Sequence, residues 1–223
     1  MTKAAKTTSR KRYVERPDIR ALLLDSAEAL IREEGYAAAT ARKIASRVDL
    51  KHQVVFYYFG SQDELLVEVF RRSAKTHREA LEKALNSSKP LSAMWNVIRD
   101  PDVTRFTLEF MALANHNEAI RDELAQNAAD IRQLETEAVD RHLKERGIDP
   151  RLSPRLVSVL TNALGRLLVQ EATLGIRDGH DEAEALVEGS LRSFEAMGDT
   201  TEGVGPIVQA MDFKEGDSST YQP

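Results

Sequence analysis

Apolar side chains recur at every third or fourth position along most of this chain, and runs of alternating β-branched residues are nearly absent. This spacing gathers apolar residues on one face of an α-helix, whereas a half-buried strand needs strict alternation. The 223 residues include 42% hydrophobic residues, enough for a sizeable core. The length favours one small and one larger module. The sequence therefore predicts an all-α protein with two modules.

Caps and helix breakers divide the periodic pattern into separate helices. Pro17 favours the start of a first helix, and Gly35 ends it. A Ser-x-x-Glu capping box at Ser61 opens a long fourth helix. We expect helices at residues 17–35, 40–48, 52–58, 61–86, 91–99, 102–116, 117–146, 153–176 and 180–197.

Charge is distributed unevenly along the chain. Residues 1–60 contain 12 Lys and Arg against 7 Asp and Glu, although the whole chain carries a net charge of −5. A basic module on an acidic body suggests that only this module meets a polyanion; a solvated basic tail is the alternative. We divide the chain into a flexible basic arm at 1–16, a three-helix domain at 17–60, a larger helical domain at 61–198 and a disordered tail at 199–223.

Several function classes are excluded by what the sequence lacks. It has no cysteine, which excludes disulfides, thiol nucleophiles and iron–sulfur clusters. No apolar run is long enough for a transmembrane helix, and no apolar segment follows the basic N-terminus as in a signal peptide. His77, His116 and His142 lie too far apart for a local metal motif, and no carboxylate pair stands out for acid–base chemistry. We expect a cytoplasmic protein that is not an enzyme and holds neither a metal nor another cofactor.

Two short expected helices, at 40–48 and 52–58, are separated by a three-residue turn at Asp49–Lys51. These are the dimensions of a helix-turn-helix. Thr40 is a favourable N-cap for the first of the two helices. Four residues of that helix point outward: Arg42, Lys43, Ser46 and Arg47.

The second of these helices has two different faces. At 100° per residue, Val55, Tyr58 and Phe59 point toward the preceding helices. The other face carries rings and an amide beside several cations. Such a face suits a DNA major groove, in which Gln and His meet base edges and cations meet phosphates. We predict a DNA-binding surface made of Thr40, Arg42, Lys43, Lys51, His52, Gln53, Val54, Phe56 and Tyr57.

Residues 17–70, and 40–66 above all, resemble the TetR family of one-component transcriptional repressors. In that family a Thr opens the second helix, Ile-Ala marks its buried face, and Tyr-x-Tyr-Phe ends the recognition helix. A Ser-Lys-x-x-Leu start to the fourth helix follows. This chain has Thr40, Ile44-Ala45, Phe56-Tyr-Tyr-Phe59 and Ser61-Gln-Asp-Glu-Leu65. The resemblance implies a homodimer that binds palindromic double-stranded operator DNA and is released by a small-molecule effector. An aromatic-rich helical core of another kind is the alternative.

Five positions depart from the family's pattern. Asp49 stands where the turn usually has Gly, but Asp tolerates left-handed backbone conformations. Lys51 replaces a Ser or Thr cap, and Gln62 replaces a Lys, so one phosphate-seeking charge is gained and one is lost. Val54 replaces a small polar residue and Phe56 a Tyr. These changes affect the operator sequence and leave the helix-turn-helix intact.

The resemblance also implies a dimer interface and an effector pocket in the larger domain. The apolar residues of helices 153–176 and 180–197 suit a four-helix interface between protomers, or an intramolecular core. Arg166 in the pocket would bind a carboxylate, or form a salt bridge across the dimer interface. We expect a largely apolar effector to contact Trp95, Phe106, Phe110, Met111 and Leu134, with Asn115, His116, Asn162 and Arg166 as polar partners.

Three functions stay open at this point. An effector-released repressor of the TetR kind is the first. The second is an effector-independent architectural or division-linked DNA-binding protein of the same fold, for which we expect a filled core. The third is a helical carrier or enzyme, against which the basic helix-turn-helix face argues.

Overall fold

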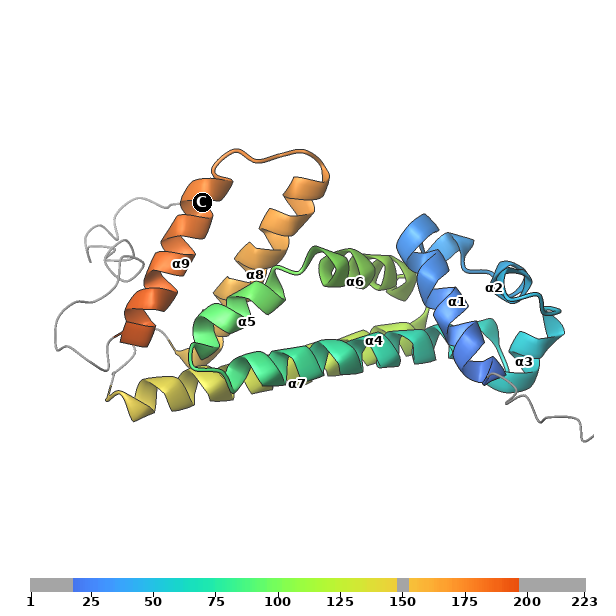
Figure 1. The fold of residues 1–223 in the computed structure, drawn as a ribbon, viewed down its shortest axis with the longest axis horizontal. Coiled ribbons are helices and arrows are strands. Elements are labelled where there is room, and N and C mark those ends of the chain that lie inside the picture. The colour runs from blue at the N-terminus through green and yellow to red at the C-terminus, as the bar shows by residue number, and fades with distance from the viewer. Residues whose placement is uncertain (1–17, 148–152, 197–223) are drawn as a thin grey trace, which may run out of the picture. The chain divides into compact units, whose positions relative to one another are not determined.

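The computed structural model describes residues 18–147 and 153–196, which are helical with no strands (Figure 1). The all-α prediction is confirmed, and each expected helix is present with ends that agree within three residues. The expected arm at 1–16 and tail at 199–223, together with Pro17, lie outside the described residues. The helices are α1 (Ile19–Glu34), the 3-10 turn η1 (Tyr36–Ala38), α2 (Ala41–Arg47), α3 (Gln53–Phe59), α4 (Gln62–Leu85), α5 (Pro90–Ile98), α6 (Pro101–Ala114), α7 (Glu118–Glu145), α8 (Pro154–Thr173) and α9 (His180–Ala196).

The chain divides into two compact units, Met1–Leu65 and Leu66–Pro223, with the boundary inside α4. In the smaller unit α1 packs against η1 and α2, and α2 packs against α3. Its core consists of fully buried aliphatic side chains: Leu23, Ala27, Leu30, Ile31, Ile44, Ala45 and Val55.

Local signals in the sequence fix the ends of α1 and its contact with α2. The Asp18 carboxylate accepts the backbone N–H of Arg20 at 3.0 Å and so caps the first turn. At the other end Gly35 adopts a φ of 84°, which glycine adopts without steric cost. The buried Ser26 hydroxyl donates to the Ile44 carbonyl at 2.8 Å, which joins α1 to α2 without leaving a buried polar group unsatisfied.

In the larger unit α7 packs along α6 and α8, and α5 packs against α8 and α9. Gly165 of α8 lies so close to α5 that an added Cβ would stand 2.7 Å from Cγ2 of Ile98. This glycine therefore permits close packing of α8 on α5 within one chain. The core cluster consists of Leu81, Leu85, Leu91, Met94, Trp95, Ile98, Ile131, Ala138, Val139, Leu143, Leu168, Val187 and Leu191.

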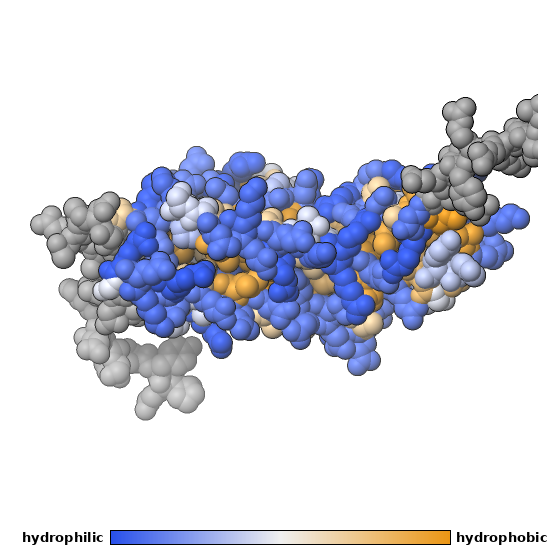
Figure 2. Space-filling model, turned by 60° about the horizontal axis from the view of Figure 1, so that its bottom comes forward, coloured by the Kyte–Doolittle hydropathy of each residue, from blue (hydrophilic) through white to orange (hydrophobic). Residues whose placement is uncertain are grey.

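Hydrophilic residues cover most of the face seen in Figure 2, and hydrophobic residues show through in separate patches. Among the helices of the described ranges, none is both long enough and apolar enough to cross a membrane.

Candidate nucleic-acid interface and cavity

The turn between α2 and α3 has the conformation expected from its residues. The Thr40 side chain accepts the backbone N–H of Lys43 at 3.3 Å and caps α2, as predicted. Asp49 has a φ of 55°, the only non-glycine residue with a positive φ among those described. The prediction that Asp49 takes the left-handed conformation of a turn glycine is therefore confirmed, and the N–H of Leu50 closes the turn on the Ala45 carbonyl at 2.9 Å.

Helix α3 buries Val55 and Phe59 and exposes the opposite face. Tyr57 is 82% exposed and Phe56 45% exposed, and His52 and Gln53 are also exposed, whereas Val54 is partly buried. These side chains expose a large part of their surface to solvent, Tyr57 most of all. They are available to a partner surface, as expected for a helix that enters a groove.

The prediction that Tyr58 packs inward is wrong, because its side chain is 38% exposed. The two buried residues of α3, Val55 and Phe59, are four positions apart and lie above one another on the helix. Tyr58 stands one position to the side of that line. Its ring instead meets the ring of Tyr57 edge-on, with centroids 5.1 Å apart.

The cations beside α3 are exposed but differ in their partners. Lys43 forms an ion pair with Glu34, and Arg47 forms two hydrogen bonds of 2.7 Å with Glu33. The hydrogen bond from Arg47 lowers the pKa of the Glu33 carboxyl, so this group stays charged next to the surface. A further two cations, Arg42 and Lys51, form no ion pair with residues in the described ranges and are free to meet phosphates.

Gln62 has a structural role that the sequence did not reveal. Its side-chain oxygen accepts the backbone N–H of Ala41 at 2.9 Å and satisfies one of the free N–H groups at the start of α2. The residue thus joins the first turn of α4 to the first turn of α2. The sequence showed only that an amide side chain follows Ser61, and the N–H that this side chain binds lies 21 residues away in the sequence.

The larger unit contains a cavity of about 420 Å3 that is lined mainly by α6 and α7, with residues from α4, α5 and α8. Of the predicted pocket residues, Met111, Asn115, Asn162 and Arg166 line it. The other lining residues are His77, Ile98, Val103, Thr104, Thr107, Ala114, Arg121, Leu124, Ala125, Asn127, Ala128 and Ile131.

The other predicted pocket residues lie elsewhere. Trp95 is 1% exposed inside the core cluster, and Leu134 packs against that cluster. The rings of Phe106 and Phe110 are both buried and pack against each other, with centroids 4.9 Å apart. His116 is exposed to solvent. Tight packing of the large rings against their neighbours leaves them no surface toward a void.

A buried polar cluster lies behind Asn162. The Asn162 side chain donates to the Glu135 carboxylate at 2.7 Å and to the Ser158 carbonyl at 3.0 Å, and the Ser158 hydroxyl donates to the same carboxylate oxygen. Burial raises the pKa of the Glu135 carboxyl, against the effect of these hydrogen bonds. Asn162 lines the cavity, and the sequence did not indicate that Glu135 lies behind it.

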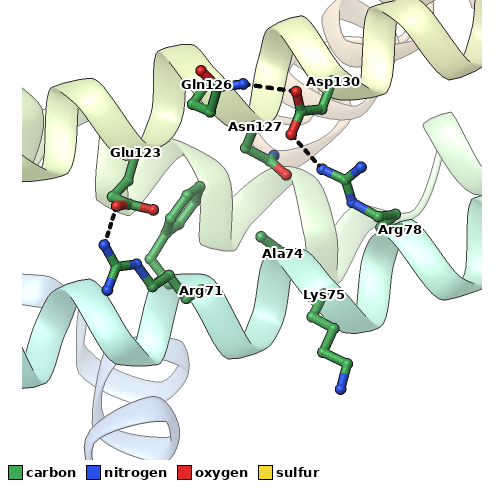
Figure 3. A pocket seen from close by; sticks show the side chains of 9 residues that line it. Arg71, Ala74, Lys75, Arg78, Glu123, Gln126, Asn127 and Asp130 are labelled. Atoms are coloured by element: carbon green, nitrogen blue, oxygen red, sulfur yellow. Dashed lines mark hydrogen bonds and ion pairs between the residues drawn. The ribbon is translucent and has the colours of Figure 1, made fainter.

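A smaller hollow lies between α4 and α7, with an ion pair at each end (Figure 3). Arg71 pairs with Glu123, and Arg78 donates to Asp130 at 2.7 Å. The two arginines are seven residues apart, as are the two acids, so equivalent turns of the two helices meet and the helices run parallel. Gln126 also donates to Asp130 at 2.7 Å and holds it toward Arg78.

Helices α8 and α9 expose an apolar stripe. On α8 its residues are separated by spacings of three, four and seven positions, which place them on one side of the helix, and Leu186 adds to it from α9. Exposed aliphatic residues at helical spacing suit the packing of a second helical surface. The α8 residues of the stripe are Leu156, Val159, Leu160 and Leu167.

The smaller unit has relatives of known class. Residues 23–69 match the family model of the bacterial regulatory proteins of the tetR family. An HTH-type transcriptional repressor of Mycobacterium tuberculosis is 38% identical over 66 residues, which cover 30% of this chain and 35% of the relative. An HTH-type transcriptional regulator of Mycobacterium bovis matches to the same extent. The chain thus matches about a third of the length of these curated relatives.

Solved structures share the fold over most of the chain. A TetR transcription regulator from Haloarcula marismortui has a TM-score of 0.60 and 20% identity, covering 82% of this chain and 97% of that one. A candidate transcriptional regulator from Saccharomonospora viridis in complex with choline has a TM-score of 0.67 and 19% identity, covering 78% and 97%. At these identities the likeness shows the fold, and the family match shows that residues 23–69 are a DNA-binding domain of the tetR type of bacterial regulatory proteins.

Proposed function

We propose that this protein is a cytoplasmic transcriptional repressor that binds a palindromic operator through α3 and is released from it by a small-molecule effector. The observation that carries the proposal is the exposed face of α3, where Tyr57, Phe56 and Gln53 stand in solvent beside Arg42 and Lys51. Rings and an amide next to cations that form no ion pair within the described ranges provide base contacts and phosphate contacts on one surface.

A homodimer is the second part of the proposal. One two-turn recognition helix contacts few base pairs, so two copies that read half-sites about 34–36 Å apart supply the affinity. The apolar stripe on α8 and α9 is a surface that two copies would bury against each other. An interface formed by the same stripe on both subunits has the twofold symmetry that a palindromic operator requires.

Release by an effector is the third part. A cavity of about 420 Å3 is within the range of small-molecule sites, and the Saccharomonospora viridis relative is a complex with a small molecule, choline. An effector that binds one conformation of the protein better than another shifts the population between them. We place the connection to the DNA-binding domain in α4, because this helix begins beside α3 and continues to the cavity residue His77. An effector-independent architectural protein would have a filled core, so the cavity argues against that alternative.

The test is DNA binding by two variants of the recognition helix. Gln53→Ala and Tyr57→Ala remove exposed side chains, so the fold is retained, while affinity for the operator falls about tenfold or more. The operator is first located by footprinting on the DNA upstream of the protein's own gene, and affinity is then measured by fluorescence anisotropy at fixed salt. Gln133→Ala, an exposed glutamine of α7, is the matched control. Unchanged affinity in both α3 variants would refute the assignment of α3.

A further inference from the structure

The cavity of the larger unit is lined by positive charge without a balancing acid. Arg121 of α7 and Arg166 of α8 both line it, and none of its lining residues is an Asp or a Glu. A cavity with charge of one sign concentrates ligands of the opposite sign. The charge of the lining therefore affects which ligands bind in the cavity. The inference about ligand class drawn below rests on the effector site proposed above.

The two arginines differ in how they are held. Arg121 donates to the Ala114 carbonyl at 3.0 Å, which fixes its guanidinium against the end of α6. Arg166 forms neither a hydrogen bond nor an ion pair with the part of the chain that the structure describes. A guanidinium has five N–H donors in a planar fork and pairs best with a carboxylate or phosphate. Arg166 thus retains its full donor capacity toward a ligand.

The neighbouring polar groups do not supply the missing counter-charge inside the cavity. Both amide hydrogens of Asn162 are engaged by Glu135 and the Ser158 carbonyl. Glu135 lies behind Asn162 and is not a lining residue, and burial raises the pKa of its carboxyl, which disfavours its charged form. Glu135 and Arg166 also act electrostatically on each other, and Arg132 acts on both and adds positive charge to this region.

His77, on α4, contributes a neutral ring at this end of the cavity. Burial lowers its pKa below the ordinary value of 6.5, the nearby Arg166 lowers it further, and Asp100 has the opposite effect. The ring is therefore uncharged at neutral pH, and the net charge of the lining comes from Arg121 and Arg166.

The rest of the lining is mainly aliphatic, with the neutral polar residues Thr104, Thr107, Asn115 and Asn127 among the apolar ones. Val103 and Met111 of α6 face Leu124 and Ile131 of α7 around the same cavity. Aliphatic walls of this kind favour a hydrocarbon body over a polyhydroxylated or multiply charged one.

We propose that the effector cavity binds an organic monoanion, an apolar body with a single carboxylate or similar acidic head group that pairs with Arg166 and Arg121. The aliphatic walls of α6 and α7 contact the body of the ligand. A cationic ligand would offer neither guanidinium group an anionic partner and would bring a third positive charge close to them.

A series of three eight-carbon probes tests the sign of the charge. Octanoate, 1-octanol and octyltrimethylammonium share a hydrocarbon chain and differ in head group, and each is titrated into the full-length protein by calorimetry. Octanoate is expected to bind about tenfold or more tightly than either of the others, because its carboxylate can accept charge-assisted hydrogen bonds from Arg121 and Arg166, both of which are exposed. Absence of octanoate binding, or equal binding of the cation, overturns the inference.

Variants of the arginines test the location. Arg166→Gln is expected to weaken octanoate binding about tenfold while leaving 1-octanol unaffected. Arg105→Gln, an exposed arginine of α6 that does not line the cavity, makes the same change in net charge and is the matched control. If Arg105→Gln weakens octanoate binding as much as Arg166→Gln, the effect comes from long-range charge and the proposed site is wrong.

Operator binding, measured in parallel, separates this inference from the proposed function. Octanoate that binds in an Arg166-dependent way without altering DNA affinity supports the ligand class and contradicts release by an effector. A cation that binds the cavity and releases DNA supports release and overturns the ligand class.

Discussion

Substituting Gly165 by Ala tests the packing of α8 on α5 through two opposing effects. In a helix interior, Ala is more favourable than Gly by about 1 kcal/mol. An added Cβ at this position, however, would stand 2.7 Å from Cγ2 of Ile98 and 3.1 Å from Cζ3 of Trp95. Both neighbours are buried core residues, with Trp95 only 1% exposed, so neither can move aside into solvent.

Overpacking a core by one methyl group costs about 1–3 kcal/mol. Because two rigid neighbours are involved, we place Gly165→Ala in the upper half of that range, for a net destabilisation of about 1–2 kcal/mol after the gain in helix propensity. Gly189→Ala on α9 is the matched control: a Cβ there meets no atom within 4 Å, so we expect a gain of about 0.5–1 kcal/mol.

Urea unfolding followed by circular dichroism gives both free energies of unfolding. The measurement is made at two protein concentrations, so that a change in self-association is not taken for a change in folding. Opposite signs for the two glycines are the expected result. If Gly165→Ala is as stable as the parent protein or more stable, the close approach of α8 to α5 is refuted.

Three further predictions follow from charged groups. Glu33→Gln removes the ion-pair partner of Arg47, so DNA should bind more tightly at low salt. The logarithm of the affinity should fall more steeply with the logarithm of the salt concentration, by up to about one unit of slope. An unchanged slope, measured by fluorescence anisotropy, contradicts this. Arg78 lowers the pKa of Asp130, so this ion pair stabilises the fold at pH values above the ordinary Asp pKa, and its contribution is lost as the pH falls through the lowered pKa. In Asp130→Asn the free energy of unfolding should therefore depend less steeply on pH in the acid range. Burial raises the pKa of Glu135, so the contribution of its protonated form to stability is complete below the ordinary Glu pKa and is lost as the pH rises. Glu135→Gln should therefore have a larger free energy of unfolding in urea than the parent protein at neutral pH, and the difference should narrow toward acid pH. A difference that stays constant with pH would contradict this.

The features that the sequence predicted correctly depend on neighbours within a few residues. The Thr40 cap needs only the N–H of Lys43, and the left-handed turn at Asp49 needs only the backbone preferences of that residue. Helix ends depend on similarly local signals. Such features can be read from a single sequence because their partners stand beside them in the chain.

The features that the sequence missed depend on contacts made in three dimensions. Tyr58 and Phe59 are adjacent aromatic residues near the end of a two-turn helix, and a helical wheel alone does not decide which of them is buried. Gln62 satisfies an N–H on a helix that begins 21 residues earlier, and only the folded smaller unit brings the two together. Periodicity predicts a buried face but does not identify the atoms that meet there.

The cavity shows the same limit and also gives a reason for it. Trp95, Phe106 and Phe110 were expected to line the pocket because they are large and apolar, and these properties cause them to fill space instead. Residues that leave space are small or are held at the edge of the packing, such as Ala125 and Ala128 of α7. A cavity within a helical domain is therefore better predicted where small residues and isolated polar residues recur on the inward faces of neighbouring helices. The aromatic residues then mark the rigid core against which the cavity keeps its shape.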